Sequence, residues 1–153
     1  MAAGLEGGCL CGAVRFKAHG EPNRTYVCYC KFCQKVTGSA FLVEPVFPKA
    51  NVEFSGGEVK VYEYRSPAHG RSLFVQFCPS CGSRFGLTTE RYPANQCMFA
   101  GAFDDPSSFV PNLQIFTDDA PKWIEFQQGI DCYHEHAFKV EGGMNEPWRK
   151  AKP

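Results

Sequence analysis

The sequence has no excess of charge of either sign, because its 16 lysines and arginines balance its 16 aspartates and glutamates. Binding to the phosphates of nucleic acids needs a basic surface. No stretch of this chain packs many lysines and arginines together. The charge pattern therefore argues against a nucleic-acid-binding protein, including one that would bind through zinc ribbons.

The sequence also lacks a long apolar run. The apolar stretch at residues 40–47 is interrupted by Glu44 and Pro45 and is far shorter than the roughly 20 residues that span a membrane. The first residues show neither the basic nor the apolar region of a signal peptide. We therefore expect no membrane partner and a reducing compartment, namely the cytoplasm, with the nucleus as the alternative.

Methionine is scarce and no long segment repeats its apolar residues at the helical period of 3.6. Phenylalanine and tyrosine are abundant instead, at 14 and 6 residues, and predict a core of rings packed between strands. Runs of strand-forming residues separated by turn residues predict an all-β fold. The predicted strands are 13–17, 25–30, 40–47, 59–64, 72–77, 84–88, 96–103 and 112–116.

The length and composition are those of one globular domain. With 44% hydrophobic and 21% charged residues, the chain has enough apolar surface to form a buried core. We expect a single zinc-binding domain over residues 1–140. The polar residues 141–153 are expected to form a tail that frays. At most one helical turn is expected, over residues 33–38, closed by Gly38.

Seven of the nine cysteines lie in three short motifs. Cysteines at such spacings converge on one point where the backbone turns, as a tetrahedral zinc ion requires. Soft thiolates favour zinc, and an iron–sulfur cluster is the alternative metal group. A disulfide framework is less consistent with an odd count of cysteines and no signal peptide. The motifs are Cys9 with Cys11, Cys28 with Cys30 and Cys33, and Cys78 with Cys81.

Seven cysteines cannot fill two sites of four ligands each, and their spacing alone does not fix how they divide. We favour one division because Cys28, Cys30 and Cys33 can form a local cup on a single turn. A catalytic zinc site has three protein ligands and one open position, whereas a structural site is closed. The closed site would then consist of Cys9, Cys11, Cys78 and Cys81.

The other two cysteines, Cys97 and Cys132, follow no ligand spacing and are interpreted as small buried hydrophobic residues. Cys132, His134 and His136 would lie on one face of an extended strand and form a weaker metal candidate. Solvated histidines are the simpler interpretation this close to the C-terminus.

Three segments resemble a known family. They are residues 7–16 (GGCLCGAVRF), 28–41 (CYCKFCQKVTGSAF) and 77–85 (FCPSCGSRF). Together with residues 101–106, 111–116 and 122–123, they resemble the glutathione-dependent formaldehyde-activating enzyme family, which also includes centromere protein V. The resemblance runs from about Gly7 to Trp123, with the cysteine motifs in matching order.

The resemblance implies a compact β-tent fold and two zinc ions per chain. It implies a structural zinc at Cys9, Cys11, Cys78 and Cys81. It implies a catalytic zinc at Cys28, Cys30 and Cys33. The activity implied is that of a carbon–sulfur lyase that acts on adducts of glutathione and formaldehyde, like an S-(hydroxymethyl)glutathione synthase. Glutathione would be a co-substrate, and the partners would be small thiols and aldehydes.

The residues suggest how such an enzyme would work. A thiol such as glutathione would enter the open position, and its sulfur would attack the carbon of an aldehyde. Lys31 and Lys35 flank the cup and could offset its charge, although ordinary surface lysines explain them as well. The alternative is a non-catalytic zinc-binding interaction module, with the cup closed by Cys97, Cys132 or a histidine. The sequence carries no signal for an oligomeric state.

Overall fold

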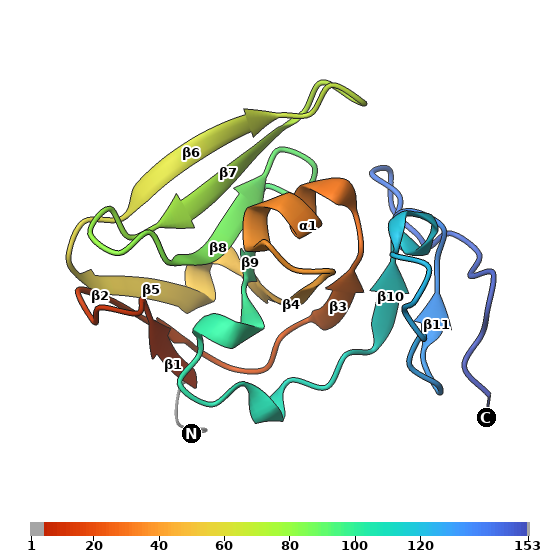
Figure 1. The fold of residues 1–153 in the computed structure, drawn as a ribbon, viewed down its shortest axis with the longest axis horizontal. Helices are drawn as coiled ribbons and strands as arrows, with labels where there is room; N and C mark the ends of the chain where they lie inside the picture. Colours follow the sequence, from red (N-terminus) through yellow and green to blue (C-terminus); the bar gives the residue numbers. More distant parts are fainter. Residues whose placement is uncertain (1–4, 153) are drawn as a thin grey trace. The chain divides into compact units, whose positions relative to one another are not determined.

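The structure is a computed structural model that describes residues 5–152 of the 153-residue chain (Figure 1). The chain forms two compact units. The first unit holds the described residues up to Asn23 together with Pro45–Phe109. The second unit holds Arg24–Glu44 and residues 110–152.

The first unit contains a three-stranded antiparallel sheet. Its strands are β1 (Leu5–Gly8), β2 (Val14–Ala18) and β5 (Val52–Gly56), with β2 in the centre. In β2 the buried side chains alternate with half-buried ones, as a strand with one covered face requires. Val14 and Phe16 therefore share the covered face.

The first unit also contains a longer run of antiparallel strands. The last part of β4 (Leu42–Pro48) pairs with β9 (Asn95–Met98), and β9 pairs with β8 (Arg84–Thr89). β8 then pairs with β7 (Ser72–Phe77), and β7 forms a hairpin with β6 (Lys60–Arg65), visible in Figure 1. Short 3₁₀ turns complete the unit: η1 (Lys49–Asn51), η2 (Ala100–Ala102) and η3 (Pro106–Ser108).

Aromatic rings fill the core of the first unit. Phe47 and Phe85 are fully buried, and the rings of Phe16 and Phe103 meet edge to face with centroids 4.9 Å apart. The ring of Phe54 lies 5.6 Å from that of Phe85. These separations fall within the range that aromatic pairs favour. The predicted core of packed rings is thus confirmed.

The second unit is built from parallel strands and one helix. β10 (Leu113–Ile115) pairs in parallel with β3 (Arg24–Cys28) and with β11 (Asp131–Cys132). The helix α1 (Lys31–Thr37) follows β3 and ends at Gly38, which adopts φ 67°. The helix begins two residues earlier than predicted and, at seven residues, is longer than the single turn expected, but the predicted glycine cap is confirmed. The 3₁₀ turn η4 (Thr117–Asp119) follows β10.

The predicted all-β fold is confirmed, because α1 is the one α-helix within residues 5–152. Each predicted strand overlaps an observed one, whereas β1, β5 and β11 were not predicted. The single domain over residues 1–140 stays a prediction, and so does fraying of the tail. In this structure the backbone of Trp148 and Arg149 forms hydrogen bonds with that of Cys132. None of the helices within the described residues is long and apolar enough to span a membrane.

The aromatic core yields a first prediction. Replacing Phe85 with alanine removes a fully buried ring and leaves a cavity, so we expect the free energy of unfolding to fall by about 3–5 kcal/mol. Urea denaturation followed by circular dichroism measures this change. Tyr62→Ala, at a position that is 61% exposed, is the control and should change the free energy by less than about 0.5 kcal/mol. Equal effects of the two substitutions would contradict the described core.

Candidate metal centres

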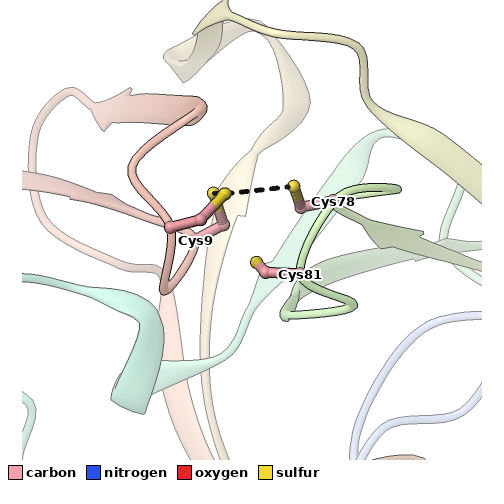
Figure 2. A group of neighbouring side chains, drawn as sticks. Cys9, Cys78 and Cys81 are labelled. Atoms are coloured by element: carbon pink, nitrogen blue, oxygen red, sulfur yellow. Dashed lines mark hydrogen bonds between the residues drawn. The ribbon is translucent and has the colours of Figure 1, made fainter.

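Two turns of the first unit bring four cysteines together. Cys9 and Cys11 lie between β1 and β2, and Cys78 and Cys81 lie between β7 and β8. Their four Sγ atoms all lie within 4.8 Å of one another. The Sγ of Cys11 lies 3.6 Å from that of Cys9 and 3.8 Å from that of Cys78. Figure 2 shows the side chains of Cys9, Cys78 and Cys81 facing the same space. We call this group the four-cysteine cluster.

The two turns share one backbone design. In each, a glycine directly after the second cysteine adopts a left-handed conformation, with φ 81° at Gly12 and 75° at Gly82. The amide of Gly12 donates to the carbonyl of Cys9 at 3.1 Å, and that of Gly82 donates to the carbonyl of Cys78 at 2.8 Å. Residues with a Cβ rarely adopt this conformation. Glycine therefore closes each turn so that both of its sulfurs face inward.

Hydrogen bonds stabilise negative charge on two sulfurs of the cluster. The amide of Val14, 3.2 Å from the Sγ of Cys9, lowers the pKa of that thiol. The hydroxyl of Ser83, aided by its own amide and that of Cys11, lowers the pKa of Cys81 to about 5. These hydrogen bonds favour the thiolate at Cys9 and Cys81, which is the form in which cysteine binds a metal.

The second unit brings the other three motif cysteines together. Cys28 ends β3, Cys30 precedes α1, and Cys33 lies in the first turn of that helix. Their Sγ atoms also lie within 4.8 Å of one another. Cys28 and Cys33 are buried, at 3% and 4% exposure, whereas Cys30 is half-buried. We call this group the three-cysteine cluster; its most accessible sulfur belongs to Cys30.

Hydrogen bonds from elsewhere in the second unit fix the loop of the three-cysteine cluster. The amide of Tyr29 donates to the carbonyl of Ile115 at 3.1 Å. The side chain of Gln34 donates to the carbonyls of Tyr29 and Asp119, at 2.6 and 3.0 Å. Lys31 donates to the same carbonyl of Asp119 at 3.0 Å. Its ammonium is therefore engaged in holding the loop against η4.

The three thiols of this cluster differ in pKa. Hydrogen bonds from Cys28 and then Cys33 hold the pKa of Cys30 well below its usual range. The proximity of Cys30 raises the pKa of Cys28 well above its usual value, and the proximity of Cys28 and Cys30 does the same for Cys33. Without a cation, these contacts therefore favour loss of the proton at Cys30 over loss at Cys28 or Cys33.

Both clusters fit zinc in their donor chemistry. All nine cysteines are free, and the sulfur separations of 3.6 and 3.8 Å in the four-cysteine cluster are far longer than the roughly 2.05 Å of a disulfide. Sulfurs bound tetrahedrally at about 2.3 Å from a zinc ion lie about 3.8 Å from each other. Donor sets made only of sulfur favour zinc over hard cations.

The remaining candidates belong to neither cluster. Cys97 is buried in β9, and Cys132 is buried in β11, where its Sγ accepts a hydrogen bond from Gln114 at 3.2 Å. His134 lies 2.7 Å from the carboxylate of Asp118, and the ring of His136 packs on Phe116. Within residues 5–152, none of these four joins a group of close metal-ligand atoms. The histidines and Cys132 therefore do not form the weaker metal site considered from the sequence.

Comparison with known proteins places the chain in a family. The family model described as glutathione-dependent formaldehyde-activating enzyme matches residues 4–119, which include all seven clustered cysteines. The chain belongs to this family. The match confirms the resemblance seen in the sequence.

Two curated relatives agree with this membership. A protein of Halomonas elongata, provisionally named a glutathione-dependent formaldehyde-activating enzyme, is 29% identical over 80% of this chain and 81% of its own length. An uncharacterized lyase of Schizosaccharomyces pombe is 27% identical over 79% of this chain and 84% of its own. Family membership and these names support the predicted enzyme class, a carbon–sulfur lyase.

One solved structure has a related fold. A Rhodobacter sphaeroides protein superposes with a TM-score of 0.54 at 18% identity, over 70% of this chain and 98% of its own. At that identity the likeness concerns the fold alone.

Several residues that shape the clusters were not predicted from the sequence. Ser83 is one, although it stands two residues after Cys81 and its hydroxyl reaches that sulfur. Gln34 and the carbonyl of Asp119 are others. A carbonyl leaves no mark on the sequence, because every residue has one. Ser83 and Gln34 carried a usable signal, because they lie within the segments at residues 77–85 and 28–41 that also hold the cysteines.

The difference in pKa among the three clustered thiols predicts how this family member reacts without metal. At pH 7, Cys30 should be alkylated by iodoacetamide more than about tenfold faster than Cys28 or Cys33, because thiolates react and buried thiols do not. Mass spectrometry of the digested metal-free protein measures the three rates. In 6 M urea the rates should become similar. Equal rates in the folded protein would contradict the described hydrogen bonds.

Proposed function

We propose that this protein is a zinc-dependent enzyme that makes and breaks the carbon–sulfur bond between a small thiol and an aldehyde. Glutathione and formaldehyde are the proposed pair, with S-(hydroxymethyl)glutathione as their adduct. The support is the family to which the chain belongs and the names of its relatives. The observation that carries the proposal is the three-cysteine cluster, whose donor set is one ligand short of a closed zinc site.

The reaction needs little from the protein besides positioning and charge. In the forward direction the thiol sulfur forms a bond to the carbonyl carbon of the aldehyde, and the proton of the thiol ends on the carbonyl oxygen. The reverse reaction breaks the same carbon–sulfur bond. A zinc ion bound by three cysteines would supply an open position at which an added thiol is held as thiolate at neutral pH.

The second unit has residues that could hold the zinc ion and a sulfur that lies close to solvent. Cys28 and Cys33 are buried and would hold the ion from within, whereas the half-buried Cys30 lies nearest to solvent. Gln34 and Lys31 fix the loop through the carbonyl of Asp119, so the cluster is held by a rigid helix start. The four-cysteine cluster would hold a second zinc ion, closed and structural.

We also expect a cytoplasmic location, because unpaired clustered cysteines persist as thiols where the compartment is reducing.

Metal counting tests the proposed division of the cysteines. Native mass spectrometry of the reduced protein should show two zinc ions per chain, and added glutathione should bind without displacing either. Cys30→Ser should lower the count to one. Cys97→Ala, which removes a buried cysteine outside both clusters, should keep two. A single ion in the unsubstituted protein would contradict the two-site proposal.

The activity itself is tested by exchange spectroscopy. NMR should show formaldehyde and glutathione exchanging with their adduct faster when the protein is present than without it. In Cys30→Ser this acceleration should be at least about tenfold smaller, because the substitution removes a proposed ligand of the open site. Cys97→Ala is again the control and should keep the acceleration. If the unsubstituted zinc-loaded protein accelerates no exchange with any of several aldehydes, the enzyme proposal fails and a non-catalytic zinc module remains.

A further inference from the structure

Ser83 touches both turns of the four-cysteine cluster. The amide of Leu10, between Cys9 and Cys11, donates a hydrogen bond to the hydroxyl of Ser83 at 2.9 Å. The same hydroxyl lies 3.2 Å from the Sγ of Cys81. One side chain thus joins the two turns through residues, Leu10 and Ser83, that are 73 positions apart in the sequence.

Packing does not hold the tip of the first turn. The side chain of Leu10 is 89% exposed, so the bond from its amide to Ser83 ties the tip to the second turn. The backbone of Ser83 is fixed, because its carbonyl accepts a hydrogen bond from the amide of Cys78 at 2.9 Å. The serine is therefore fixed in its own turn and reaches across to the other.

The direction of each hydrogen bond at the Ser83 hydroxyl follows from its one hydrogen and two lone pairs. A serine hydroxyl has one hydrogen to donate and two lone pairs to accept with. An amide N–H only donates, so Leu10 occupies a lone pair and leaves the hydroxyl hydrogen free. A cysteine bound to a metal is a thiolate and has no hydrogen of its own. In the metal-bound protein, the contact between Ser83 and Cys81 must then be a bond donated by the serine.

We propose that Ser83 is a positioning residue of the four-cysteine metal site, joining its two turns by accepting a bond from Leu10 and donating one to the sulfur of Cys81. The inference rests on the proposed metal binding of that cluster. Such a bond disperses charge on the sulfur and fixes its direction, so it lowers the competition from protons and slows the loss of the metal.

This contact differs from the other bonds that support the sulfurs. Cys9 accepts from the amide of Val14 at 3.2 Å, and Cys30 accepts from the amide of Cys33 at 3.3 Å. Every residue except proline has a backbone N–H, so most substitutions leave these bonds in place. The hydroxyl of Ser83 can be removed, and the proposal is therefore open to a direct test.

The test compares two variants of equal size. Ser83→Thr keeps a hydroxyl, and Ser83→Val replaces it with a methyl group of the same shape. Ser80→Ala is the matched control, because Ser80 lies in the same turn and is exposed. Zinc release to a chromophoric chelator is followed from pH 5 to 8. Iodoacetamide and mass spectrometry then report whether the freed cysteines are those of the four-cysteine or the three-cysteine cluster.

We expect Ser83→Val to release zinc from the four-cysteine cluster at least about tenfold faster than the unsubstituted protein, with the release extending to higher pH. Ser83→Thr and Ser80→Ala should behave like the unsubstituted protein, and release from the three-cysteine cluster should be the same in all four. In cobalt-loaded protein, Ser83→Val should shift the sulfur-to-cobalt charge-transfer band to longer wavelength, because the sulfur of Cys81 loses the hydrogen bond from the serine hydroxyl. Ser83→Thr should not shift the band.

Equal release from Ser83→Thr and Ser83→Val, with equal spectra, would overturn the role of Ser83 while leaving the metal site intact. An unsubstituted protein that holds no metal at the four-cysteine cluster would overturn both. A second measurement needs no variant: in the unsubstituted protein, the amide hydrogen of Leu10 should exchange with solvent at least about tenfold more slowly with zinc than without. Equal exchange in the two forms would also overturn the inference.

Discussion

Cysteine sulfurs held within 4.8 Å of one another repel once they are deprotonated, and a cation among them turns this repulsion into attraction. The chain assembles two such groups, one in each compact unit. The cysteines form no disulfides, and neighbouring sulfurs of the four-cysteine cluster lie 3.6 and 3.8 Å apart. The surrounding turns, caps and hydrogen bonds keep the sulfurs together. The proposed zinc ions would also stabilise the fold. The unfolded chain has no preformed site, so the free energy of metal binding adds to that of folding.

The two clusters are assembled differently, and the difference fits the roles proposed for them. The four-cysteine cluster joins residues 67 positions apart, so a metal there would close a long loop. The three-cysteine cluster is local, formed where β3 passes into α1, and depends on β10 and η4 for its support. A long-range closed site suits stability, and a local site with an accessible sulfur suits chemistry.

The sequence predicted more of the site than of its surroundings. Cysteine spacing acts locally, so both clusters were within reach of sequence analysis. The runs around Val14 and Phe74 alternate or carry strand formers, which made β2 and β7 predictable. In contrast, β1 (LEGG) contains two glycines, and it becomes a strand because β2 pairs with it. The support of Gln34 and Lys31 by the carbonyl of Asp119 depends on tertiary structure and was out of reach.

The central claim is that the sulfurs divide four and three, leaving one metal with a position that no side chain fills. Anomalous diffraction at the zinc edge from crystals of the reduced, zinc-loaded protein tests it most directly. Two peaks are predicted, one surrounded by Cys9, Cys11, Cys78 and Cys81, the other by Cys28, Cys30 and Cys33 with water or an added thiol as its fourth ligand. A single peak, or a second peak whose fourth ligand is a side chain of this protein, would contradict the claim.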